Sequence, residues 1–85
     1  MITYQHTITR ELGIHARPAI LIVKNAGQFT CRISLESGRH RADAKDIMAV
    51  MSMMMCKGDL LTVTFEGTDE EQAASLLSTL ISENL

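Results

Sequence analysis

The chain of 85 residues has no tryptophan, one proline, two cysteines, one tyrosine and two phenylalanines. So few aromatic rings, together with a net charge of −2, argue against nucleic-acid binding, which relies on basic surfaces and stacking platforms. Cys31 and Cys56 form neither a CxxC pair nor a dense framework, so we expect reduced thiols rather than a structural disulfide.

Long apolar runs are also missing. No run approaches the roughly 18 residues of a membrane span, and the first residues lack the basic-then-apolar order of a signal peptide. We therefore expect a cytoplasmic protein without membrane insertion. The length allows a single domain over 1–85, with room for one sheet and a few helices but not for a deep enclosed active site.

Charge is distributed unevenly along the chain. The first 57 positions carry all eight basic residues and four acids, whereas the remaining positions carry six acids and no base. Such asymmetry can steer an acidic partner toward one face. A dispersed, solvated surface explains the same counts equally well until a fold places the charges.

The first half of the chain shows two periodic segments. Alternating apolar and polar residues predict a half-buried strand over roughly 2 to 8. A helix is predicted from 16 to about 26, because Pro18 stands just inside its start and Gly27 just past its end.

A hairpin and a short helix are predicted next. Alternation over 30 to 36 followed by the turn signal Ser37-Gly38 predicts a hairpin whose charged second strand, 40 to 43, is an edge. Asp46 is a good N-cap for a helix over 47 to 53.

The last third of the chain predicts a strand and a helix. Residues 60 to 65 alternate as a fourth strand, and 68 to 71 (Thr-Asp-Glu-Glu) read as a capping box before apolar residues at helical spacing. The predicted order is β-α-β-β-α-β-α. This order predicts an α+β fold with helices on one face of a sheet, and the alternation in every strand suits an antiparallel sheet.

His15 at the start of the first predicted helix is the main candidate for chemistry. Neutral imidazole is a nucleophile and imidazolium a good leaving group, so a histidine can accept and release a phosphoryl group. The first-turn amides of Ala16 and Arg17 have no intrahelical acceptor and can bind a dianion, and the Arg17 guanidinium adds charge-assisted donors. A lone histidine at this place can equally serve a turn or a cap.

The segment Gly13-Ile14-His15-Ala16-Arg17-Pro18-Ala19 resembles the active-site signature of HPr, the histidine phosphocarrier of the bacterial phosphoenolpyruvate-dependent sugar phosphotransferase system. The resemblance extends over essentially the whole chain through the element order and the segment 57–59 (Lys-Gly-Asp). It implies that His15 is phosphorylated on Nδ1 by enzyme I and dephosphorylated by sugar-specific IIA proteins. It also implies an open-faced β-sandwich of four antiparallel strands with three helices on one face, and a carrier that is not an enzyme. We expect no cofactor and no metal.

The resemblance also implies a docking surface formed by residues 47, 48 and 51 (Ile, Met and Met). Flexible methionines suit a surface that fits several partners, although burial in the core is the commoner fate of apolar residues at this spacing. Val50 and Met53 are available to face inward instead. Arg17, Lys24 and Lys45 are the candidate positive rim for acidic partners, and we expect a monomer.

Asp46 departs from the family pattern. In HPr of Gram-positive bacteria a serine stands here and is phosphorylated by a regulatory kinase, a switch that aspartate cannot support. Asp46 is either only a helix cap or a permanent negative charge that imitates the modified state. Met54 replaces a usual Gly or Ala, which costs on the order of 1 kcal/mol if its φ is positive.

Two rival interpretations remain open. An HPr-like regulatory module would bind a partner such as a transcriptional regulator, with Asp46 fixing its state and little phosphotransfer. The soft ligands Cys56 and the methionines at 48, 51, 53, 54 and 55 suggest copper, but the CxxC loop of copper carriers is missing. His6 on an apolar strand face and His40 on a charged edge are better explained as structural or solvated.

Overall fold

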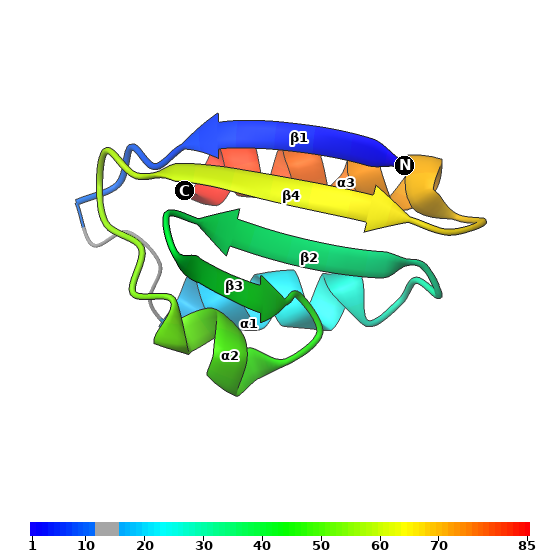
Figure 1. Ribbon diagram of the computed structural model, residues 1–85, viewed down its shortest axis with the longest axis horizontal. Helices are drawn as coiled ribbons and strands as arrows, with labels where there is room; N and C mark the ends of the chain where they lie inside the picture. The colour runs from blue at the N-terminus through cyan, green and yellow to red at the C-terminus, as the bar shows by residue number, and fades with distance from the viewer. Residues whose placement is uncertain (12–15) are drawn as a thin grey trace.

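The computed structural model describes residues 1–11 and 16–85 (Figure 1). The elements follow the predicted order: β1 (Ile2–Thr7), α1 (Ala16–Ala26), β2 (Arg32–Ser37), β3 (His40–Asp43), α2 (Ile47–Ser52), β4 (Leu60–Glu66) and α3 (Glu70–Asn84). The four strands form one antiparallel sheet in the order β1-β4-β2-β3, and the helices lie on one of its faces. The predicted fold is confirmed, including the place of β3 at an edge.

Strand alternation determines which sheet face is covered. In β4 the side chains of Leu61, Val63 and Phe65 are fully buried, while the residues between them point to the open face. Burying one such side chain stabilises the fold by about 1.5–3 kcal/mol. The register pairs Ile2 with Phe65 and Leu35 with Val63, so β4 supplies the centre of the core.

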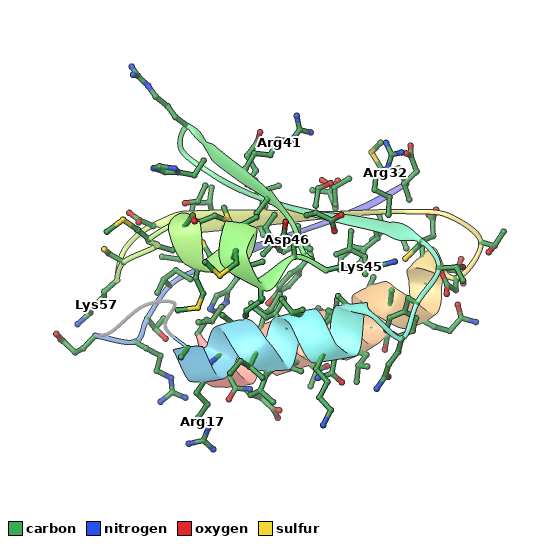
Figure 2. All side chains as sticks on the ribbon, turned by 90° about the horizontal axis from the view of Figure 1, so that it is seen from below. Arg17, Arg32, Arg41, Lys45, Asp46 and Lys57 are labelled. Atoms are coloured by element: carbon green, nitrogen blue, oxygen red, sulfur yellow. The ribbon has the colours of Figure 1, made fainter. Side chains whose placement is uncertain are left out.

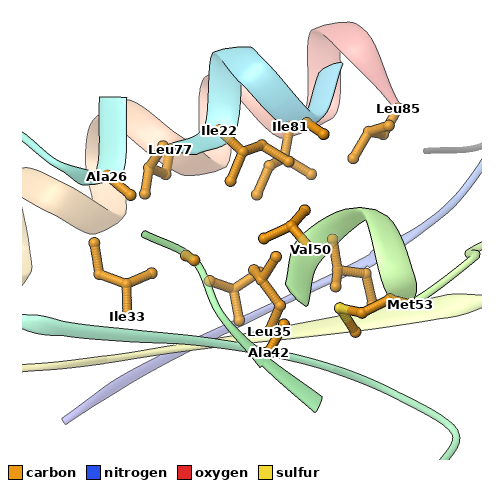
Figure 3. Close-up of a cluster of buried hydrophobic side chains, with 14 of the residues drawn as sticks. Ile22, Ala26, Ile33, Leu35, Ala42, Val50, Met53, Leu77, Ile81 and Leu85 are labelled. Atoms are coloured by element: carbon orange, nitrogen blue, oxygen red, sulfur yellow. The ribbon is translucent and has the colours of Figure 1, made fainter. Parts of the chain in front are cut away.

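The helices cover this inner face with their apolar stripes (Figure 3). Their buried residues are Pro18, Ala19, Ile22 and Ala26 of α1, Val50 of α2, and Ala73, Leu77 and Ile81 of α3. Small residues at the contacts let the helix backbones lie close to the sheet. The opposite faces of the helices are free to carry function.

The start of α3 corrects the predicted capping box. The helix begins at Glu70, and Asp69 in the cap position makes no side-chain cap hydrogen bond. Its carboxylate instead accepts hydrogen bonds from the backbone N–H groups of Thr30 and Cys31, at 2.8 and 2.9 Å. The Thr30 amide is the main reason that the pKa of Asp69 lies below its usual value. Two loop amides aimed at one carboxylate therefore replace the local cap.

Glu70 and Gly67 complete this junction between α3 and the loop before β2. The Glu70 carboxylate accepts the Gly67 N–H at 3.1 Å, which is the main cause of its lowered pKa. Gly67 has φ of 150°, and a Cβ added there would lie 2.7 Å from the Cα and Cβ of Cys31. Only glycine fits at position 67, so close to Cys31. Burial, aided by Asp69, raises the pKa of the Cys31 thiol.

Candidate functional site

The predicted chemistry centres on His15, which lies outside the described residues. The structure begins α1 at Ala16, directly after it, and Arg17 is exposed in the first turn. The first amides of a helix lack intrahelical acceptors, and the positive end of the helix dipole lies there. Figure 2 shows Arg17 extending outward from this end of α1. Within residues 1–11 and 16–85, Arg17 forms no ion pair.

The segment that leads toward α1 is held by the loop between α2 and β4. Ile8 exchanges backbone hydrogen bonds with this loop: its N–H donates to the Asp59 carbonyl at 2.9 Å, and its carbonyl accepts the Gly58 N–H at 2.8 Å. Lys57 Nζ also lies 3.2 Å from Glu11 Oε1, with both side chains exposed. The loop after α2 therefore lies beside the chain that approaches the histidine.

The short helix α2 presents the predicted docking residues. Met48 is 71% exposed and Met51 41% exposed, whereas Ile47 is half-buried. Val50 is fully buried and Met53 is 3% exposed, as expected for the two residues that were available to face inward. This arrangement leaves two flexible apolar side chains facing solvent.

Asp46 caps α2 as predicted. Its carboxylate accepts hydrogen bonds from the amides of Met48 and Ala49 at 3.1 and 3.2 Å. The helix ends at Ser52, one residue before the predicted end, and Met53 is its C-cap. Asp46 is thus a structural cap whether or not its charge also affects partners.

The predicted positive rim is divided by the fold. Lys24 is exposed in the last turn of α1, while Arg17 marks the other end. Lys45 is half-buried, and its Nζ donates a 2.6 Å hydrogen bond to the Phe29 carbonyl. Figure 2 shows Lys45 directed away from Arg17. Lys45 therefore holds the loop before β2.

Met54 follows α2 with φ of 51°, so the condition under which its side chain costs about 1 kcal/mol is met. Its side chain is 74% exposed, which places it with Met48 and Met51 at intervals of three residues. Sequence reasoning considered Met54 for its backbone and as a soft ligand, and missed it as an exposed apolar residue beside the docking helix. The repeat of methionines at intervals of three was the available signal. We call Met48, Met51 and Met54 the methionine triplet.

The remaining candidate residues from the sequence are Cys56, His6 and His40. The Cys56 thiol donates to the Met54 carbonyl at 3.4 Å and is exposed. Across the described ranges, no three His, Cys, Asp or Glu side chains are grouped to hold a metal ion. His6 stacks near Tyr4 with ring centroids 6.4 Å apart, and His40 is exposed on β3.

Comparisons with known proteins match this architecture over nearly its whole length. A family profile described as the PTS HPr component phosphorylation site matches residues 2–83. The phosphocarrier protein HPr of Lysinibacillus sphaericus is 40% identical over 83 residues, covering 98% of this chain and 94% of that protein. The HPr-like protein Crh of Halalkalibacterium halodurans is 35% identical, with 98% and 99% covered.

Solved structures agree. The histidine-containing phosphocarrier protein of a Mycoplasma superposes with a TM-score of 0.93 at 29% identity, covering 96% of this chain and 93% of that one. A dimer of HPr from Thermoanaerobacter tengcongensis, 37% identical, gives a TM-score of 0.76 with 92% and 90% covered. In the described part of the chain, no helix has the length and apolar character to cross a membrane. The chain therefore belongs to the HPr family, the phosphocarrier proteins of the phosphotransferase system, which are not enzymes.

Proposed function

We propose that this chain accepts a phosphoryl group on His15 from enzyme I of the phosphotransferase system and passes it to IIA proteins. The observation that carries the proposal is the start of an 11-residue helix at Ala16, immediately after His15, in a chain of the HPr family. A helix N-terminus at this place supplies donors for the dianion that the transfer creates. A surface site also suits a group that passes between two partners.

The residues of the site divide the transfer into separate roles. A neutral His15 nitrogen attacks the phosphorus of the phosphorylated donor, the bond from phosphorus to the donor breaks, and the donor leaves with its electron pair. The amides of Ala16 and Arg17 and the Arg17 guanidinium then stabilise the new dianion. In the second step an acceptor takes the phosphoryl group, and the imidazole leaves.

Docking is assigned to α2 and its surroundings. Exposed Met48 and Met51, with half-buried Ile47, offer an apolar surface beside the helix that follows His15. Lys24 and Arg17 contribute positive charge on α1. We also propose that the chain is cytoplasmic and acts as a monomer. Sedimentation analysis at micromolar concentration would test the monomer against the dimers known in the family.

Phosphorylation by purified enzyme I tests the carrier function. The wild-type chain with phosphoenolpyruvate and enzyme I should gain one acid-labile phosphoryl group by intact mass. His15→Ala should gain none, whereas His40→Ala, which removes another exposed histidine, should gain the group at the wild-type rate. An unmodified wild type with cognate enzyme I contradicts the proposal, as does labelling that survives in His15→Ala.

A regulatory binding module is the second candidate, because a Crh protein is among the relatives and Asp46 fixes a negative charge beside the docking helix. Its partner would be a regulator such as a transcription factor. This function predicts tight binding to that regulator with little transfer, and recovery of transfer in Asp46→Ser. Kinase and ATP should phosphorylate Asp46→Ser but leave the wild-type residue unmodified.

A further inference from the structure

Five methionines lie within ten residues, and the fold separates them into two groups. Met48, Met51 and Met54 are 71%, 41% and 74% exposed. Met53 and Met55 are 3% and 2% exposed. Residues of the same type and almost the same sequence position therefore differ more than tenfold in contact with solvent.

Backbone conformation causes this separation. Residue 53 continues the inward face that Val50 begins on α2, with φ of −67°. At Met54 φ changes to 51°, so its side chain turns outward between two buried neighbours. The left-handed residue thereby adds a third exposed methionine just beyond the end of the helix.

Exposed thioethers react with peroxides. The sulfur attacks one peroxide oxygen, the O–O bond breaks, and the sulfur loses two electrons to become a sulfoxide while the second oxygen leaves as water. The product is polar and chiral where the thioether was apolar and flexible, and sulfoxide reductases reverse the change. The reaction needs only the thioether, which the chain supplies, and a peroxide from solution.

We propose that the methionine triplet is a site of reversible oxidation, and that its conversion to sulfoxides by a peroxide weakens docking of phosphotransfer partners. The modification follows from exposure alone, whereas its consequence rests on the proposed carrier function. A partner that covers Met48 and Met51 would have to bury a sulfoxide oxygen without a matched donor. Such burial lowers affinity by roughly tenfold or more.

Peptide masses test the modification directly. Cleavage after Lys45 and Lys57 releases residues 46–57, which contain all five methionines in one fragment. Folded protein treated with hydrogen peroxide, in a Cys56→Ser background that removes the exposed thiol, should gain oxygen at residues 48, 51 and 54 while 53 and 55 stay unmodified. Urea-unfolded protein should gain oxygen at all five. Equal oxidation of the two groups in the folded protein refutes the assignment.

Binding and transfer measurements test the consequence. Oxidised protein should show about tenfold weaker binding to enzyme I, and a higher KM in phosphotransfer, than the same protein untreated. In a triple variant with leucine at 48, 51 and 54, peroxide treatment should change neither value, each sample being compared with its own untreated control. Sulfoxides that leave binding and KM unchanged overturn the proposed consequence. An untreated protein that accepts no phosphoryl group refutes the carrier function, and with it the consequence for transfer, while the peptide masses still decide the modification.

Discussion

Substitutions at Asp46 separate its capping role from its charge. The carboxylate accepts from two amides of a six-residue helix, at 3.1 and 3.2 Å. Asp46→Ala returns both donors to water and should cost about 1 kcal/mol, a loss of about 4–8 °C in Tm for a domain of this size. Asp46→Asn keeps an acceptor and loses only the favourable charge at the helix N-terminus, about 0.3–0.5 kcal/mol. Thermal and urea unfolding measure both.

The same variants report on function when transfer from enzyme I is measured. If the charge alone opposes docking, Asn, Ser and Ala at position 46 should all lower the KM for enzyme I, in spite of their different stabilities. If Asp46 is only a cap, KM should follow the integrity of α2, so Asn and Ser resemble the wild type and Ala does not. An Asn variant as unstable as the Ala variant would refute the capping argument.

Three further predictions concern the backbone and the acid-sensitive junction. Met54→Gly should stabilise the fold by about 0.5–1 kcal/mol in urea unfolding, because glycine relieves the positive φ, whereas Met54→Ala should change little and thereby controls for the lost side chain. Gly67→Ala should cost about 2–3 kcal/mol because its Cβ meets Cys31, while Gly38→Ala, with φ of 60° and open space, should cost about 1 kcal/mol; equal losses would contradict the steric argument. Asp69→Asn should be less stable at neutral pH. Because the folded-state pKa of Asp69 is lowered, its contribution to stability is complete above the unfolded pKa and is lost as pH falls through the folded pKa. The stabilities of the two proteins should therefore converge in strong acid. A stability difference that persists in strong acid would rule out this linkage.

Much of the fold was predictable because its signals are local. The alternation in β4, and the positions of Pro18 and Gly27 at the two ends of α1, depend only on near neighbours. The structure places both elements as expected. The Asp46 cap was predictable for the same reason, since a carboxylate two and three residues before free amides needs no tertiary contact.

What could not be predicted depends on distant partners. Asp69 looked like part of a local cap, but its two oxygens accept the backbone amides of Thr30 and Cys31, which lie 39 and 38 residues away. Lys45 was assigned to a positive rim, and no local signal indicated that its side chain reaches the Phe29 carbonyl across 16 residues. Sequence periodicity carries no information about such pairs, because each side chain had an acceptable local interpretation.

The sheet order has a consequence for how the protein is made. β2 and β3 are joined by a tight turn and can pair as soon as both are synthesised. Among the described strands, β1 pairs with β4 alone, and residues 60–66 of β4 are translated much later. A nascent chain that stops before β4 therefore holds its first strand without a neighbour and its apolar side chains uncovered. The centre of the sheet therefore forms only when β4 is available, because β4 pairs with both β1 and β2.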